Sequence, residues 1–167
     1  IFIKIKIWQK KNLENCCWNM KNIKMIKKDF KYDFSIPKYA TPGSAGLDLH
    51  ACLEKPVTVK PGQICKIPTG IAIQIKNKEV AGFIFPRSGL ASNYGISLVN
   101  SVGVIDSDYT GELICPIINY GKDDYTINPG DRIAQIVFLP VYTARFIMTD
   151  ELDETARGSG GFGSTGK

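Results

Sequence analysis

The sequence has little of what builds a protein metal centre. It contains one histidine, His50, and its five cysteines include no Cys-x-x-Cys pair. Structural zinc sites need four sulfur or nitrogen ligands at short spacings, so the sequence excludes such a site, and we expect His50 to be a surface or hydrogen-bonded histidine. The number of cysteines is odd, which does not fit a closed disulfide framework. We therefore expect reduced thiols and a cytoplasmic protein, with organellar and nuclear locations left open.

Long apolar runs and phosphate loops are missing as well. Lysines interrupt the opening Ile1–Trp8 segment at alternate positions, so no transmembrane helix or secretory signal is predicted. No Gly-x-x-x-x-Gly-Lys-Ser/Thr pattern occurs, which excludes a P-loop. Residues 1–28 carry eight lysines and one acid, whereas the whole chain has a net charge of +5, so residues 29–167 carry −2. Residues 29–167 therefore offer no basic face to the phosphate backbone of a nucleic acid. We expect neither a nucleic-acid nor a membrane partner.

What the sequence does contain, from Pro37 onward, is the pattern of an all-β protein. A chain of 167 residues has room for one domain. Turn signals recur at short intervals, as in Lys60-Pro61-Gly62 and Asn128-Pro129-Gly130. Between them lie short runs of alternating polarity, such as Gly70–Lys76, in which the three isoleucines share one face. Many short strands predict a sandwich or a closed barrel, because closure removes exposed edges.

The C-terminal residues 157–167 contain five glycines around one arginine and one phenylalanine. Glycine-rich backbone resists ordering, and chain ends are commonly disordered. The segment also holds Arg157, the hydroxyls of Ser164 and Thr165, and the Phe162 ring, which suit phosphate binding and base stacking. We interpret it as an arm that becomes ordered around a ligand.

Three polar side chains stand beside apolar runs. Asp48 and Asp106 each follow such a run, and either carboxylate alone would be an ordinary turn residue. Gln135 is predicted to share a strand face with Ile133 and Val137, where a buried amide would need partners. Those partners would be backbone groups or a bound substrate with its water.

Five ordered motifs resemble the trimeric deoxyuridine triphosphate nucleotidohydrolase (dUTPase) family, and the resemblance covers Tyr32–Lys167. The motifs are Gly43-Ser44-Ala45-Gly46-Leu47-Asp48-Leu49, Pro86-Arg87-Ser88-Gly89-Leu90, Gly103-Val104-Ile105-Asp106-Ser107-Asp108-Tyr109-Thr110-Gly111, Gly130-Asp131-Arg132-Ile133-Ala134-Gln135 and Arg157-Gly158-Ser159-Gly160-Gly161-Phe162-Gly163-Ser164-Thr165-Gly166. The resemblance implies a jelly-roll β-barrel with a flexible C-terminal arm, and hydrolysis of dUTP to dUMP and diphosphate.

The resemblance also implies roles for residues on the nucleoside side. The segment 100–106 would form a hairpin whose backbone, including Val104 and Ile105, reads uracil together with the Asn100 side chain. Tyr109 would pack under the deoxyribose and exclude a 2′-hydroxyl. Asp106 would accept the 3′-hydroxyl and act as general base on the attacking water. Ile114 would touch the base through its main chain.

On the phosphate side, the resemblance implies contacts from Arg87, Ser88 and Gly89 and from Gln135, which would also help to place the water. Mg²⁺ would be held mainly by the substrate phosphates, with Asp48 reaching it through water. The remaining implied ligands, all on the arm, would close over the site: Arg157, Phe162, Gly163, Ser164 and Thr165. The family builds three sites per homotrimer from all three subunits.

The predicted organisation is a basic extension (1–28), a barrel domain (29–154) and an arm (155–167) that closes over a neighbouring subunit's site. The role of the extension is left open, and its residues 1–24 are expected to take no part in the chemistry. A dCTP deaminase is the nearest alternative, but Pro116 stands where that family has its glutamate base. The other alternative is a non-enzymatic barrel, which the complete set of candidate side chains disfavours.

Overall fold

The computed structural model describes residues 23–27 and 36–161, and in that part of the chain the fold is all-β, as predicted. One short helix, α1 (Ser88–Tyr94), interrupts the strands. Within these residues, no helix has both the length and the hydropathy needed to cross a membrane. The strands in chain order are β1 (Lys24–Lys27), β2 (Leu47–His50), β3 (Val57–Val59), β4 (Ile64–Gln74), β5 (Val80–Pro86), β6 (Ile96–Leu98), β7 (Gly103–Ile105), β8 (Glu112–Asn119), β9 (Tyr125–Ile127) and β10 (Arg132–Pro140).

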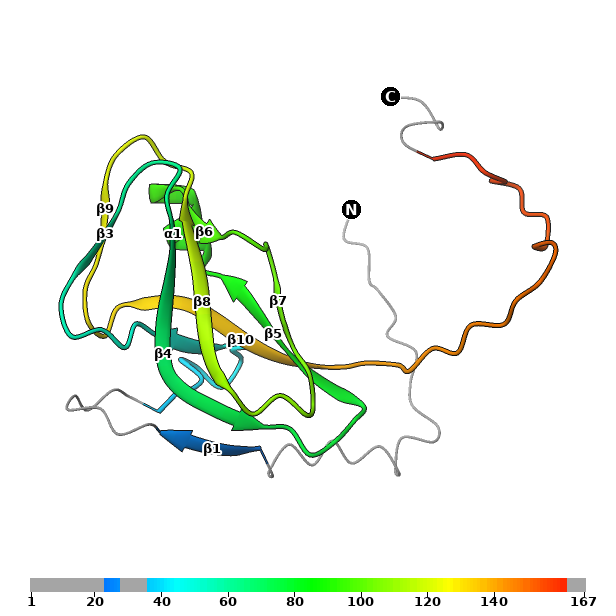
Figure 1. The fold of residues 1–167 in the computed structure, drawn as a ribbon, viewed down its shortest axis with the longest axis horizontal. Helices are drawn as coiled ribbons and strands as arrows, with labels where there is room; N and C mark the ends of the chain where they lie inside the picture. Colours follow the sequence, from blue (N-terminus) through cyan, green and yellow to red (C-terminus); the bar gives the residue numbers. More distant parts are fainter. Residues whose placement is uncertain (1–22, 28–35, 162–167) are drawn as a thin grey trace, which may run out of the picture.

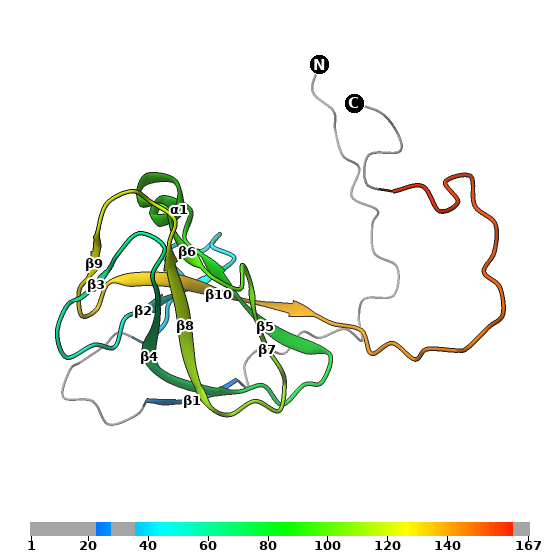
Figure 2. The same cartoon turned by 45° about the horizontal axis from the view of Figure 1, so that its top comes forward.

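The strands form two main antiparallel sheets that pack face to face (Figure 1). One sheet has the order β1-β4-β8-β6 and the other has the order β2-β10-β5-β7. The short pair β3-β9 lies at one end of this sandwich (Figures 1 and 2). Among the described strands, the predicted barrel is therefore built as packed sheets that do not join into one continuous hydrogen-bonded ring.

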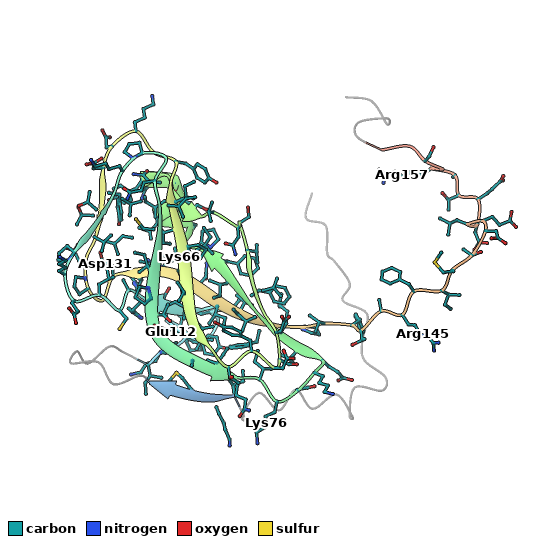
Figure 3. The ribbon with its side chains drawn as sticks, viewed as in Figure 1. Lys66, Lys76, Glu112, Asp131, Arg145 and Arg157 are labelled. Atoms are coloured by element: carbon teal, nitrogen blue, oxygen red, sulfur yellow. The ribbon has the colours of Figure 1, made fainter. Side chains whose placement is uncertain are left out.

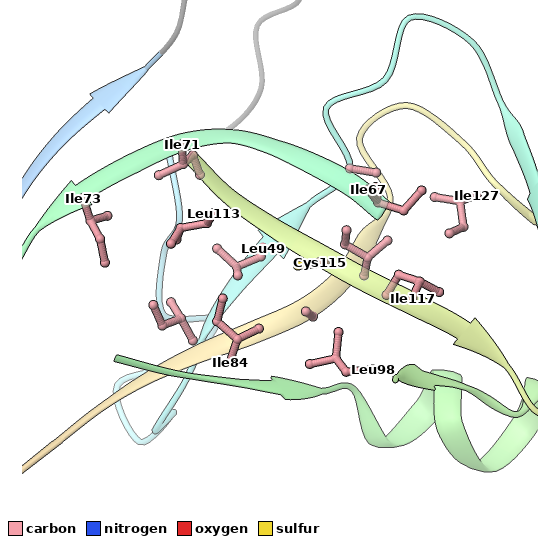
Figure 4. Packing of buried hydrophobic residues seen from close by; sticks show 14 of the residues in the cluster. Leu49, Ile67, Ile71, Ile73, Ile84, Leu98, Leu113, Cys115, Ile117 and Ile127 are labelled. Carbon is pink, nitrogen blue, oxygen red and sulfur yellow. The ribbon is translucent and has the colours of Figure 1, made fainter. Parts of the chain in front are cut away.

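The core lies between the two main sheets and is made of aliphatic side chains (Figure 4). The predicted alternation in β4 holds for Ile71 and Ile73, which are buried, and for Gln74, which is exposed, but not for Ala72, which is buried as well. Leu113 from the neighbouring strand β8 packs in the same core cluster, and so does Leu49 from β2 in the opposite sheet (Figure 4). Branched side chains of this kind suit a pleated surface that is covered on one face.

Strand β1 lies inside the segment that we predicted to be an extension. It pairs antiparallel with β4, with Met25 opposite Ile73. Ile23 and Met25 are half-buried against the core. The first strand of the sheet thus begins before residue 29, and the predicted boundary at that residue divides the barrel from one of its own strands.

After β10 the chain leaves the sheets, and residues 141–161 extend away from them (Figures 1 and 2). Large apolar side chains on this segment are almost fully exposed: Tyr142 by 97%, Phe146 by 93% and Met148 by 95%. Arg145 and Arg157 both lie on it, clear of the barrel (Figure 3). A monomeric protein rarely leaves so many large apolar groups in water.

Candidate active site

In the sheet β2-β10-β5, three residues that are distant in sequence lie next to one another on adjacent strands. Gln135 on β10 lies opposite Asp48 on β2 and opposite Phe85 on β5. The Gln135 amide Nε2 donates to the Pro86 carbonyl over 3.1 Å. Gly46 leaves the space that this amide occupies, since a Cβ at residue 46 would lie 2.7 Å from Gln135 Oε1. The pairing register therefore gathers the first, second and fourth motifs at one place.

Two arginines share the Asp48 carboxylate. Arg87 Nε lies 3.0 Å from Asp48 Oδ1, and Arg132 Nη1 lies 3.2 Å from Asp48 Oδ2. Arg87 Nη1 also donates to the Arg132 carbonyl over 3.4 Å. The cluster has more positive than negative charge, so it suits an anionic ligand.

Ser88 and Gly89 are exposed and begin helix α1, with Arg87 in an extended conformation just before it. The first N–H groups of a helix have no partner within the helix and point outward. Ser88 and Gly89 therefore present backbone donors in the segment that directly follows Arg87.

His50 follows Asp48 on the same face of β2 and lies opposite Arg132. Burial lowers the pKa of His50; the Asp48 carboxylate opposes this shift, and the two arginines of the cluster add to it. In the described part of the chain its buried Nδ1 has no hydrogen-bond partner, and the residue as a whole is half-buried.

The nucleoside-side candidates lie around the turns that flank β7. Ser101 has a positive φ of 61°, and Val102 N donates to the Asn100 carbonyl over 2.6 Å, which makes a tight turn. Strand β7 then pairs with β5, while β6 pairs with β8. The segment 100–106 is therefore a tight turn leading into a strand of the other sheet, and its two halves do not pair with each other as in the predicted hairpin.

Exposed apolar side chains surround this turn. Val104 is 58% exposed and Ile114 is 47% exposed. The Tyr109 ring folds back over Gly111, and its hydroxyl donates to the Glu112 carbonyl over 2.9 Å. Asp106 is exposed at the end of β7, and its carbonyl accepts from Tyr109 N. The carboxylate is thus open to solvent beside an apolar surface that could hold a ring.

Within one chain the two groups of candidates lie far apart. Ile105 pairs with Gly82, so Asp106 is level with Ala81 near the start of β5, whereas Arg87 follows the last residue of that strand. About six residue steps separate the two levels, which corresponds to about 20 Å along a strand. The structure places Asp106 and Tyr109 near one end of β5, and Asp48, Arg87 and Gln135 near the other end.

The arm residue Arg157 joins neither group. Its Nε donates to the Gly160 carbonyl over 2.8 Å in a local turn. The other predicted arm ligands, Phe162, Gly163, Ser164 and Thr165, lie outside the described residues.

Arg132 is the site residue to which sequence reasoning gave no role. The signal was available in part, because two core residues, Ile133 and Ala134, stand next to each other just after it. Strict alternation cannot bury two neighbours, so such a pair can mark a β-bulge.

The match to a family model decides what kind of protein this is. The model described as dUTPase matches residues 32–166. The chain belongs to the dUTPase family. A deoxyuridine 5′-triphosphate nucleotidohydrolase of Desulfitobacterium hafniense is 58% identical over 131 residues, which cover 78% of this chain and 87% of the relative. The corresponding protein of Coxiella burnetii is 52% identical, over 87% of this chain and 95% of that protein.

Solved structures show the same fold for this dUTPase-family chain. The dUTPase of Staphylococcus bacteriophage 80alpha with dUPNHPP has a TM-score of 0.78 at 23% identity, over 88% of this chain and 99% of its own. A mutant dUTPase from phage phi11 of S. aureus, whose structure details the coordination of a structural Mg(II) ion, has a TM-score of 0.69 at 22% identity, over 78% of this chain and 97% of its own. The predicted all-β dUTPase fold is therefore confirmed.

Proposed function

We propose that this chain carries out the reaction of its family, the hydrolysis of dUTP to dUMP and diphosphate. The observation that carries the proposal is that Asp48 on β2, Gln135 on β10 and Arg87 just after β5 lie together. These three residues suit a phosphate chain, and the exposed carboxylate of Asp106 suits activation of water. The reaction lowers dUTP and supplies dUMP for thymidylate synthesis.

The phosphates bind to the Arg87 guanidinium and to the N–H groups of Ser88 and Gly89. Among the described residues, no three His, Cys, Asp or Glu side chains lie close enough together to hold a metal ion. Both oxygens of Asp48 already accept from arginines. This donor set fits Mg²⁺ that binds the substrate phosphates and contacts Asp48 only through water. When bound, Mg²⁺ neutralises charge on the leaving diphosphate.

On the nucleoside side, the backbone of Val104 and Ile105 with the Asn100 amide reads the uracil edge, and Ile114 contacts the base. The Tyr109 ring lies under the deoxyribose, where a 2′-hydroxyl would clash. The Asp106 carboxylate accepts a proton from the water whose oxygen attacks the α-phosphorus, and Gln135 orients this water. The bond from the α-phosphorus to the bridging oxygen breaks, and diphosphate leaves.

The distance between the two groups of residues supports a site that is shared between chains. Asp106 and Gln135 must reach the same α-phosphate, yet in one chain Gln135 is level with Phe85 and Asp106 with Ala81, four residue steps or about 13 Å apart along β5. The conflict is removed when a second copy of the chain places its phosphate-binding residues (Asp48, Arg87 and Gln135) next to the Asp106 of the first copy. We therefore propose a homotrimer with shared sites, which also gives the exposed apolar side chains of residues 141–152 a surface to cover.

The arm completes the site of a neighbouring subunit. In this proposal Phe162 stacks on the base, while Arg157, Gly163, Ser164 and Thr165 contact the γ-phosphate and exclude water. The domain division then becomes an extension before β1, a barrel that includes β1, and the arm from residue 155. The protein acts in the cytoplasm on a small nucleotide, with no nucleic-acid or membrane partner.

The test is diphosphate release from dUTP, dCTP, dTTP and UTP with Mg²⁺ present. Because base and sugar are both read, we expect dUTP to be hydrolysed at least about a hundredfold faster than any of the others. Ammonia release from dCTP would instead identify a deaminase. Absence of turnover on all four nucleotides would support the non-enzymatic barrel.

A further inference from the structure

A β-bulge at the start of β10 determines where the Arg132 side chain points. Arg132 pairs with His50 and Ala134 pairs with Leu49, so Ile133 is an extra residue in β10. Both Ile133 and Ala134 are buried, at 2% and 0% exposure. Without the extra residue, alternation would turn the Arg132 side chain toward the core. Bulges near active sites commonly redirect a side chain in this way.

The redirected side chain belongs to a chain of contacts that ends at Arg87. Arg132 Nη1 holds Asp48 Oδ2, and Asp48 Oδ1 holds Arg87 Nε. The Arg132 carbonyl accepts from Arg87 Nη1 as well. Arg87 is therefore fixed at two of its nitrogens, and both fixing groups depend on residue 132.

The burial of these three side chains increases toward the carboxylate. The Arg132 side chain is 52% exposed, that of Arg87 is 27% exposed and that of Asp48 is 19% exposed. A lone exposed ion pair contributes little, but a half-buried carboxylate shared by two guanidinium groups has a fixed orientation. Loss of either arginine leaves one oxygen of Asp48 without its partner and free to rotate.

We propose that Arg132 is a positioning residue that orients Arg87 toward phosphate by holding Asp48. The inference rests on the proposed function in one respect, that Arg87 binds the substrate phosphates. In this proposal Arg132 contacts Asp48 and not the phosphates, and its Nη1 donates to Asp48 Oδ2 over 3.2 Å. Its effect on substrate binding must therefore pass through the carboxylate.

A double-mutant cycle separates this role from direct phosphate binding. The affinity for dUPNHPP is measured by calorimetry for the wild type, Arg132→Ala, Asp48→Asn and the double variant, each confirmed as folded by thermal unfolding. We expect Arg132→Ala to weaken binding about tenfold in the wild type and less than about twofold in the Asp48→Asn background. An equal loss in both backgrounds would show that Arg132 contacts phosphate directly and would overturn the proposal.

Two further variants control for charge. Arg132→Lys keeps the charge and a donor, so it should recover most of the lost affinity. Lys66→Ala removes one positive charge from an exposed position on β4, in the other sheet, and should leave affinity within about twofold of the wild type, because exposed charges at such distances are screened. An equal loss in Lys66→Ala and Arg132→Ala would reduce the effect to net charge and contradict the proposal.

One readout is independent of substrate. The Arg87 Nε–H proton, bonded to Asp48, should give a slowly exchanging NMR signal that is assigned by its loss in Arg87→Lys. We expect the signal in the wild type and in Arg132→Lys, and its loss in Arg132→Ala. A signal that persists in Arg132→Ala, or that is missing from the wild type, would refute the positioning role. Failure of the wild type to bind dUPNHPP would instead refute the proposed function.

Discussion

At the scale of single residues, Gly111 determines where the Tyr109 ring can lie. A Cβ on residue 111 would approach the Tyr109 hydroxyl to 2.5 Å and the ring carbon Cζ to 2.6 Å. The ring is the mobile end of a side chain, so it would shift while the backbone stayed in place. Because this ring is the proposed barrier to a 2′-hydroxyl, the glycine controls the choice of sugar indirectly.

Gly111→Ala should therefore weaken the discrimination against UTP without unfolding the protein. We expect the ratio of kcat/KM for dUTP over UTP to fall about tenfold or more, because contacts to a sugar hydroxyl dominate such discrimination. Steady-state kinetics on both nucleotides measure the ratio. Gly43→Ala is the matched control, since a Cβ there meets nothing within 4 Å. An unchanged ratio in Gly111→Ala would remove Tyr109 from sugar selection.

Asp106 can be tested with a minimal change. Asp106→Asn keeps the shape of the side chain but cannot accept a proton from water, so kcat should fall by about 10²–10⁴-fold. Binding of dUPNHPP should stay within about tenfold of the wild type, since most contacts survive. Near-normal turnover in this variant would show that another group is the general base.

Single elements show what the sequence could and could not predict. The strand pattern and the motifs were enough to identify the fold and the candidate residues, because turn signals and alternation are local. The face of Gln135 was predicted incorrectly: Ile133 is in the core, whereas Gln135 lies on the outer face with Val137. The bulge between Arg132 and Ala134 reverses the phase, and it depends on pairing with β2, which is distant in sequence.

A local sequence pattern also could not predict the side-chain contacts between strands. The bridge from Arg87 through Asp48 to Arg132 joins β2 and β10 to the end of β5. A turn aspartate and an ion-paired aspartate look alike in sequence. Only the register, with Asp48 opposite Gln135, shows that this carboxylate lies on the same face as the amide.

Strand β1 gives a prediction at the element scale. Deletion of residues 1–22 leaves Ile23 and β1 intact and should change neither the melting temperature nor kcat. Deletion of residues 1–27 removes the strand that pairs with β4, together with two half-buried apolar side chains. We expect this larger deletion to cost about 2–4 kcal/mol of unfolding free energy, measured by denaturant titration. Equal stability of the two truncated proteins would show that β1 contributes nothing to the barrel.

At the scale of the whole molecule, the two sets of proposed site residues lie too far apart in one copy of the chain to bind the same substrate. The proposed phosphate-binding residues, Asp48, Arg87 and Gln135, lie near the end of β5, and Asp106 lies near the start of that strand. The segment after β10 carries exposed apolar side chains away from the sheets (Figure 1). Both features are explained when neighbouring copies complete each other's sites.

Mixing two inactive variants tests this account most directly. Arg87→Ala chains retain Asp106, and Asp106→Ala chains retain Arg87, so each homotrimer should be nearly inactive. When the two are refolded together in equal amounts, about a quarter of the sites in a cyclic trimer should combine an intact Asp106 with an intact Arg87. The account predicts dUTP hydrolysis at about a quarter of the wild-type rate for the whole refolded mixture, in which native mass spectrometry confirms that mixed trimers have formed. Mixed trimers without recovered hydrolysis would contradict it, because both residues would then serve the same site from one chain.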